Sequence, residues 1–370
     1  MSCPLPPEIL DLVVDHLHDK PTMLKTCCVI SKSWIQRTRR HLFAGVEFDN
    51  SESEIELWKK AFPDPSNSPA HHTRSLLVHG ALAADADVGN WISAFHNVEH
   101  LLLSYMDRNS LFPFYGLSSA IRSLRLIIVP LDVDLICSFP LLEDLALVPS
   151  PMEDEDGWKV PLTSPKLTGT LDLEMYGRSS ALTRRLLVLP GGLRFSKIIV
   201  MFPGKDAKSV TDLVSRCSDT LEFLTLDLHP QGAFLQPLRL ASTSPPFTHV
   251  DASEVPSLDL SKASKLKYLE FLLTVPSVQW ITTTLRSVES KNLQFIRINS
   301  FDNIREPVME PFGQEWQDLD RLLVQFWASH SVRPRVEYIV EEGGKDLGGR
   351  APSLLPELTR RGLIDLVQSI

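Results

Sequence analysis

Four short stretches carry the side chains whose types point to chemistry. They are the adjacent thiols Cys27 and Cys28, the adjacent imidazoles His71 and His72, the acidic residues 153–156 (EDED), and the dipeptide Gly204–Lys205. In proteins generally, such side chains act as thiolate nucleophiles, zinc ligands, calcium ligands and phosphate-binding loops. Each of these activities needs a particular spacing, so the spacing decides whether this chain is an enzyme.

None of the four stretches has the spacing that its chemistry requires. The acidic run lacks the spaced oxygen ligands and the glycine of a calcium loop, and the Gly-Lys pair lacks the first glycine of a phosphate loop. The histidine pair lies in a Pro- and Ser-rich stretch, where adjacent side chains should diverge. The two thiols are best explained as small buried side chains. GxSxG, HExxH and GxGxxG are absent as well. We therefore expect no catalytic residue, no metal and no cofactor, with a hydrolase or transferase of degenerate motif as a remote alternative.

The composition is that of a globular protein of the cell interior. Hydrophobic residues make up 43% and charged residues 22% of the 370 residues. The net charge of −9 argues against a nucleic-acid partner, which usually meets a basic surface. The cysteines are odd in number and form no CxxC, which favours free thiols in a reducing compartment. Neither a signal peptide nor an apolar run of about 18 residues is visible, so we expect a cytoplasmic or nuclear protein without membrane contact.

The first forty residues show apolar side chains at helical spacing. A helix should follow Pro6 and Pro7, a second should start near Thr22, and a third should follow Ser31 as its N-cap. Three such short helices bury little surface, and a unit of under about 40 residues usually needs a metal, a disulfide or a partner to be stable. Since no metal or disulfide pattern is present, we expect a partner chain to cover part of the apolar surface.

These residues resemble an F-box over roughly residues 4–48. The resemblance is carried by LPPEILDLVVDHL and then LKTCCVISKSWIQRTRRHLF. Two stretches depart from the family pattern, namely HLHDKPT between the first two helices and Thr26-Cys27-Cys28, where small residues are common. The resemblance implies a three-helix module that docks on a Skp-type adaptor and so joins a cullin–RING ubiquitin ligase, whose other subunits transfer ubiquitin. Such a contact places helical apolar anchors in a groove of the partner. The expected adaptor-binding residues are Leu5, Pro6, Glu8, Ile9, Leu10, Leu12, Val13, Leu17, Leu24, Val29 and Trp34.

The rest of the chain repeats one pattern, apolar-x-x-apolar-x-apolar. It recurs from TRSLLV at Leu76 to LQFIRI at Ile296, at intervals close to the 20–29 residues typical of leucine-rich repeats. The pattern resembles an irregular leucine-rich-repeat array over roughly residues 70–340. The predicted fold is α/β, a three-helix F-box followed by a curved solenoid with a parallel sheet. The predicted domains are an F-box at 1–48, a linker at 49–73, the solenoid at 74–340, and a C-terminal linker with a capping helix at 341–370. The structural alternative is a long doubly wound α/β domain.

The outward positions of the predicted strands form a mixed-charge inner surface. We expect it to bind a protein substrate through Arg125, Asp172, Glu174, Thr225, Asp227, Glu270, Arg297 and Asn299. Composition and irregular repeats together resemble fungal F-box proteins of large divergent families. The sequence thus predicts a substrate-recognition adaptor subunit of a Skp–cullin–F-box ubiquitin ligase. The alternative is a leucine-rich-repeat interaction module without a ligase link, in which the N-terminal helices act as a cap.

Overall fold

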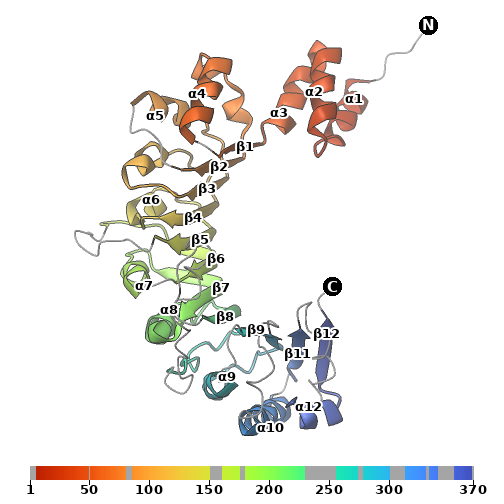
Figure 1. The fold of residues 1–370 in the computed structure, drawn as a ribbon, viewed down its shortest axis with the longest axis vertical. Coiled ribbons are helices and arrows are strands. Elements are labelled where there is room, and N and C mark those ends of the chain that lie inside the picture. Colours follow the sequence, from red (N-terminus) through yellow and green to blue (C-terminus); the bar gives the residue numbers. More distant parts are fainter. Residues whose placement is uncertain are drawn as a thin grey trace, which may run out of the picture. The chain divides into compact units, whose positions relative to one another are not determined.

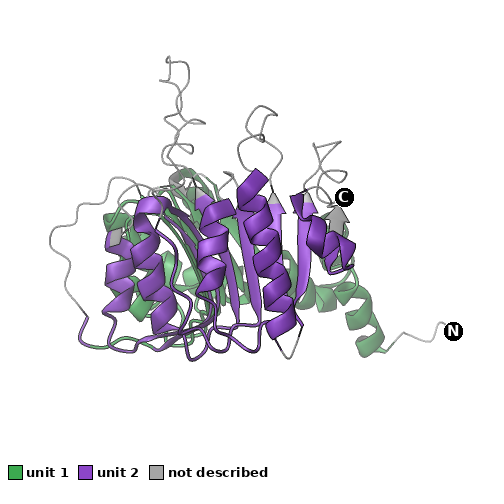
Figure 2. Ribbon diagram, turned by 90° about the horizontal axis from the view of Figure 1, so that it is seen from below, with its two compact units in different colours: residues 1–153, 163–165 green, residues 154–162, 166–370 purple. Residues whose placement is uncertain are grey.

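The structure is a computed structural model that describes residues 6–49, 51–80, 86–150, 161–175, 180–229, 256–273, 278–300, 313–330, 333–340 and 354–368. It is an α/β protein in which the paired strands are parallel, as the repeat pattern predicts (Figure 1). The chain forms two compact units, one of residues 1–153 and 163–165 and the other of residues 154–162 and 166–370 (Figure 2).

The first unit begins with three short helices, in the segment where the apolar spacing predicts three. They are α1 (Pro7–Asp15), α2 (Pro21–Ile30) and α3 (Ile35–Leu42), the last preceded by the 3₁₀ turn η1 (Lys32–Trp34). Proline stands at the first position of α1 and of α2, where its missing N–H costs nothing and its fixed φ suits a helix. Glu8 lies in the first turn of α1, where a negative charge complements the helix dipole.

A parallel sheet forms the rest of the first unit. Its strands are β1 (Gly45–Phe48), β2 (Ser75–His79), β3 (His100–Ser104), β4 (Ser123–Val129) and β5 (Asp144–Pro149), paired in the order of the chain. The leucines of the repeat fall in register, because Leu76 lies opposite Leu101 and Leu101 opposite Leu124. These side chains are buried, so neighbouring repeats build one continuous apolar row.

Between these strands run α4 (Ser51–Ala61), α5 (Ala86–Ser93), α6 (Val133–Cys137) and the 3₁₀ turns η2 (Pro65–Asn67), η3 (Pro69–His72) and η4 (Asn109–Phe114).

Two domain boundaries differ from the expected ones. Strand β1, placed in the F-box by sequence, pairs with β2 in the sheet. Residues 49–73, expected as a linker, contain α4, whose Trp58 packs edge-to-face on Phe48 at 5.8 Å. The aromatic side chains of the segment hold it on the sheet.

In the described part of the second unit, the strands pair in the order of the chain. They are β6 (Leu167–Glu174), β7 (Leu193–Pro203), β8 (Phe223–His229), β9 (Tyr268–Leu273), β10 (Phe295–Ser300), β11 (Arg335–Val340) and β12 (Ile364–Gln368). The connections hold α7 (Ser180–Leu187), η5 (Gly204–Asp206), α8 (Ala207–Arg216), α9 (Val278–Arg286), α10 (Gly313–Ser329) and α12 (Pro356–Arg360). Figure 2 shows the helices of this unit on one face of its sheet.

The C-terminal segment differs from the prediction of a linker and a capping helix at 341–370. Its described residues contain only the short α12, and the chain then forms β12, which pairs parallel with β11. The sheet thus continues beyond residue 340. Residues 341–353, part of the expected linker, lie outside the described residues.

The strand order speaks against the doubly wound alternative in each unit. A doubly wound sheet reverses its strand order at a switch point and carries helices on both faces. Here, strands that are neighbours in the chain are neighbours in the sheet throughout each unit. Sequential parallel order is typical of solenoids, in which each repeat buries its apolar face against the next.

Candidate partner-binding surfaces

The three N-terminal helices share a very small core. Val14 of α1, Leu24 and Cys27 of α2, and Thr38 of α3 are buried, and Thr38 donates a hydrogen bond to the Trp34 carbonyl at 2.6 Å. Each helix thus contributes one or two side chains to the interior. Such a core leaves most of the apolar side chains of α1 and α2 without an internal partner.

A set of large apolar side chains on α1 and α2 is exposed to solvent. We call this set the α1–α2 apolar set: Ile9 (44% exposed), Leu12 (55%), Val13 (46%), Met23 (51%), Val29 (87%) and Ile30 (64%). Almost half of the exposed large apolar side chains in the described part of the chain belong to it. Since exposed apolar side chains concentrated in one place commonly mark an interaction surface, this segment is the first candidate site.

The structure divides the predicted adaptor-binding residues into three groups. Pro6, Glu8, Ile9, Leu12, Val13 and Val29 are exposed, and Leu10, Leu17 and Trp34 are half-buried. Leu24 is only 1% exposed and fills the core between the helices, so it offers no surface to a partner. Leu5 lies outside the described residues.

Two members of the set, Met23 and Ile30, are not among the adaptor-binding residues expected from the sequence. Leu24 and Cys27 stand three residues apart and are both buried, so they define the inner face of α2. Ile30 is 64% exposed and follows Val29, at 87%, at the end of the helix. The C-terminal end of α2 therefore presents two apolar side chains, Val29 and Ile30, to solvent.

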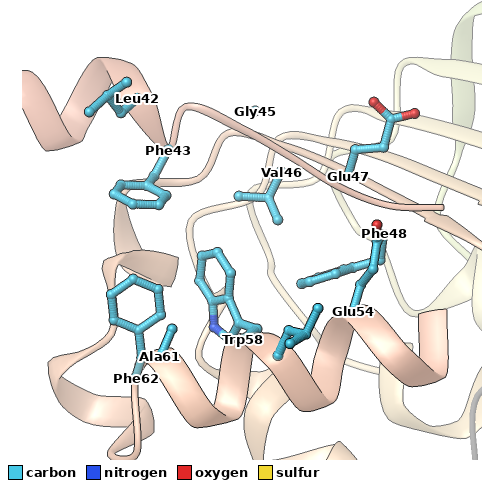
Figure 3. A pocket seen from close by; sticks show the side chains of 11 residues that line it. Leu42, Phe43, Gly45, Val46, Glu47, Phe48, Glu54, Trp58, Ala61 and Phe62 are labelled. Atoms are coloured by element: carbon cyan, nitrogen blue, oxygen red, sulfur yellow. The ribbon is translucent and has the colours of Figure 1, made fainter. Parts of the chain in front are cut away.

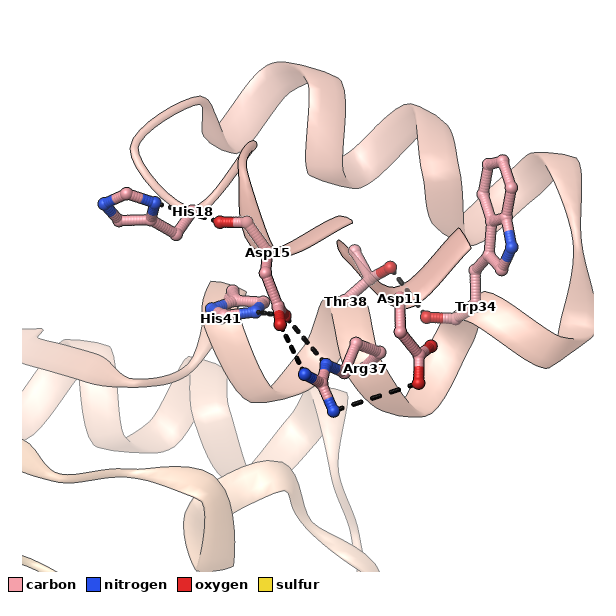
Figure 4. A network of polar contacts seen from close by, with 7 residues as sticks. All are labelled: Asp11, Asp15, His18, Trp34, Arg37, Thr38 and His41. Carbon is pink, nitrogen blue, oxygen red and sulfur yellow. Dashed lines mark hydrogen bonds and ion pairs between the residues drawn. The ribbon is translucent and has the colours of Figure 1, made fainter. Parts of the chain in front are cut away.

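A polar cluster holds α1 against α3 (Figure 4). The Asp15 carboxylate accepts hydrogen bonds from Arg37, with Nε to Oδ1 at 2.7 Å and Nη2 to Oδ2, and lies 2.7 Å from His41 Nε2. Two side chains of the basic run QRTRRH at residues 36–41, those of Arg37 and His41, are engaged in this cluster. Arg37, and next His41, hold the pKa of the Asp15 carboxyl well below its usual range.

Asp15→Asn should loosen the packing of α1 on α3 at pH 7. The pKa of Asp15 is lowered in the folded chain, so its stabilising contribution is fully present above the ordinary value of 3.8 and is lost as pH falls through the folded-state value. Hydrogen exchange measured by mass spectrometry should be several-fold faster in residues 7–42 of the variant at pH 7. The difference between variant and wild type should narrow at pH values well below 3.8.

Asp19→Asn is the matched control, because Asp19 is exposed in the turn after α1. It should leave exchange in residues 7–42 unchanged. Equal exchange rates in Asp15→Asn and wild type at pH 7 would contradict the structural role of the cluster.

The second candidate surface is the open face of the second unit, opposite its helices. Thr225, Glu270, Arg297 and Glu337 lie in register on four adjacent strands. Thr225 Oγ1 donates to Glu270 Oε2 at 3.0 Å, and Arg297 donates to Glu337 Oε2 through Nε at 2.8 Å and Nη2 at 2.6 Å. Arg335 pairs with Asp365 on β12. We call these six side chains the polar ladder: Thr225, Glu270, Arg297, Glu337, Arg335 and Asp365.

An aromatic row runs beside the polar ladder. Phe223, Tyr268 and Phe295 are in register on β8, β9 and β10, with ring centroids 6.0 and 6.1 Å apart. The guanidinium of Arg297 lies 5.3 Å from the centre of the Tyr268 ring, a cation–π contact. Burial, and next the charge of Glu270, raises the pKa of Tyr268 to about 12, so its hydroxyl stays protonated. The surface combines aromatic faces with fixed charges.

Most predicted substrate-binding residues lie in the second unit, and three of them lie together in the polar ladder. Thr225, Glu270 and Arg297 form part of the polar ladder, whereas Arg125 lies on β4 of the first unit. Asp172 and Glu174 lie on β6, and Asn299 follows Arg297 at the next open position of β10. Asp227 is only 4% exposed and Thr225 only 8% exposed, so these two side chains offer little surface to a substrate.

The sequence reasoning missed Glu337, Arg335 and Asp365 because it ended the repeats at LQFIRI. The signal was present: RVEYIV at 335–340 has the same alternation as the earlier copies.

The structure describes three of the four stretches first considered for chemistry, namely the thiols, the histidine pair and Gly204–Lys205. Cys27 is buried, and the acidic residues 153–156 lie outside the described residues. Burial raises the pKa of Cys217, and of Cys137, to about 11, which keeps both thiols protonated at neutral pH. The His71 and His72 rings do not diverge as expected, because their centroids are 3.9 Å apart. Among the described residues, no group of three or more His, Cys, Asp or Glu side chains is placed to hold a metal ion.

Within the described ranges, none of the helices has the length and apolar character that a bilayer crossing requires. No model of a known protein family matches the chain, and no curated protein matches it either.

Proposed function

We propose that the chain is a substrate-recognition adaptor subunit of a Skp–cullin–F-box ubiquitin ligase. Helices α1–α3 dock on the Skp-type adaptor, and the open face of the second unit binds a protein substrate. The observation that carries this proposal is the α1–α2 apolar set, six large side chains left in solvent by a three-helix segment that resembles an F-box. The chain itself performs no chemistry and uses no metal or cofactor, because ubiquitin is transferred on other subunits. We place it in the cytoplasm or nucleus, where such ligases act.

The distribution of burial explains why a partner is needed. Val14, Leu24 and Cys27 already occupy the interior, so the exposed side chains cannot turn inward without displacing them. Covering an exposed Leu, Ile or Val contributes about 1.5–3 kcal/mol, and several such anchors together support a specific complex. Helical spacing of the anchors fits a helix-in-groove contact, the mode that the F-box resemblance implies.

The proposal is tested by mixing the full chain with a purified Skp-type adaptor. Isothermal titration should show a one-to-one complex with a Kd below about 1 μM. Absence of binding at an adaptor concentration of about 100 μM would contradict the ligase link. The chain would then be a repeat module without that link, its N-terminal helices serving as a cap.

Arg335→Glu should weaken substrate capture without affecting the adaptor. Arg335 is 55% exposed at its side chain and pairs with Asp365 across β11 and β12, so the reversed charge would face Asp365 and Glu337 at the edge of the polar ladder. In affinity purification from proteasome-inhibited cells, co-purified substrates should fall at least five-fold while adaptor recovery stays constant.

Arg122→Glu is the matched control for this experiment. Arg122 pairs with Glu143 in the first unit and has a similar side-chain exposure of 50%. Equal losses in both variants, or unchanged partners in Arg335→Glu, would exclude the polar ladder as a substrate contact.

A further inference from the structure

A groove lies at the first edge of the sheet in the first unit. Strand β1 pairs with β2 on one side, and among the described strands none pairs with its other side. On that side a hollow of about 460 Å³ opens between β1 and α4 (Figure 3). Its apolar lining consists of Leu42, Phe43, Val46, Phe48, Leu57, Trp58, Ala61 and Phe62. We call this hollow the β1–α4 groove.

The aromatic wall of the groove is already packed. Trp58 lies 4.9 Å from Phe62 and 5.8 Å from Phe43, measured between ring centroids, and Phe43 meets Phe62 edge-to-face at 6.0 Å. Leu57 is 65% exposed on the same helix. An apolar occupant would therefore meet preformed walls and gain contact with an exposed leucine, at little cost in ordering the site.

The edge of β1 presents backbone groups to the groove. The Ala44 carbonyl accepts from Arg74 and Ser75 at 2.8 and 2.9 Å, so it points toward β2. The Asp49 N–H donates instead to Glu54 Oε2 on α4 at 2.7 Å, away from β2. Because successive residues of a strand turn their N–H and C=O groups to opposite sides, those of Gly45 and Glu47 face the free edge. Such an edge is a template for an added strand.

The charge at the groove selects its occupant. Glu47 and Asp49 on the β1 side and Glu54 on α4 bring three carboxylates together, and within the described residues no Lys, Arg or His side chain pairs with them. The charge of the nearby Asp49 raises the pKa of Glu47, as expected where carboxylates lie close together. A basic occupant would relieve the repulsion, whereas an acidic one would increase it.

We propose that the β1–α4 groove binds an extended segment of another protein in which apolar and basic side chains alternate, added as a strand beside β1. Backbone hydrogen bonds to Gly45 and Glu47 would hold the segment, its apolar side chains would enter the groove against Leu57 and Trp58, and its basic side chains would face the carboxylates. This site uses none of the α1–α2 apolar set and does not rest on the proposed ligase function.

The test uses the full chain and a fluorescein-labelled peptide, acetylated and amidated, of sequence KVKVKV. Fluorescence polarisation should show saturable binding with a Kd below about 0.1 mM. The acidic peptide EVEVEV should bind at least ten-fold more weakly. A KVKVKV peptide whose alternate backbone amides are methylated cannot donate hydrogen bonds from them. This peptide should also bind at least ten-fold more weakly. Equal binding of the basic and acidic peptides, or of the methylated and parent peptides, would overturn the proposal.

Matched variants locate the binding. Leu57→Lys and Glu47→Lys should each weaken KVKVKV binding at least ten-fold, because both side chains line the groove. As controls, Leu141 is 49% exposed and Asp144 is an exposed carboxylate on β5. Leu141→Lys and Asp144→Lys should bind KVKVKV as tightly as wild type does. Equal losses in the controls would refute the site. So would peptide-independent, concentration-dependent dimers that Leu57→Lys abolishes, since the groove would then be a contact between two copies.

Discussion

Replacing Leu12 and Val29 together with aspartate should reduce binding of the Skp-type adaptor at least 100-fold. The two side chains are 55% and 87% exposed, so the folded chain alone loses little by the change. In a complex that covers them, each substitution would remove about 1.5–3 kcal/mol of apolar burial and leave a charge at a dry contact. A factor of 100 corresponds to about 2.8 kcal/mol, which is less than the loss expected from two such anchors.

Leu141→Asp with Val188→Asp is the matched control for this double variant. Both side chains are about half-exposed and lie outside the N-terminal helices, so adaptor affinity should not change. Melting temperatures of all variants should agree within a few degrees. If Leu12→Asp with Val29→Asp bound the adaptor with wild-type affinity, the α1–α2 apolar set would not be the docking surface.

The helical pattern of the first forty residues foretold the three helices but not which of their apolar side chains are internal. Leu12 and Leu24 are the same residue type at helical spacing, yet one is 55% exposed and the other 1%. Spacing within one helix defines an apolar stripe, whereas the packing of three helices decides which part of the stripe is covered. That decision depends on contacts between segments far apart in the chain, such as Asp15 with Arg37.

The parallel sheet could be predicted from the repeat, but its last strand could not. The residues around Ile364 suit a helix or a strand by their spacing alone. They form β12 because β11 offers a strand edge to pair with, placing Tyr338 opposite Leu366. The polar ladder could likewise be predicted only in part from the sequence. The outward position of Arg297 follows from strand alternation, whereas its pairing with Glu337 joins residues on adjacent repeats.

Trp280→Ala should lower the free energy of unfolding of the second unit by about 3–5 kcal/mol. Trp280 is 1% exposed on α9 and packs against Phe202 of β7 at 5.9 Å and against Phe271 of β9 at 5.8 Å. Its Nε1 also donates to the Pro256 carbonyl at 3.2 Å. The substitution would leave a large cavity between a helix and two strands and an unpaired carbonyl beside it.

Graded variants separate the packing of Trp280 from its hydrogen bond. Trp280→Phe keeps most of the volume and should cost about 1–3 kcal/mol, whereas Val188→Ala, at a half-exposed position, should cost little. In a solenoid each repeat is stabilised mainly by its neighbours, so hydrogen exchange should accelerate in residues 193–203 and 268–286 far more than in residues 100–129. Uniform acceleration over all these ranges would instead show that the chain unfolds as one cooperative unit, and the stability of the repeats would not be local.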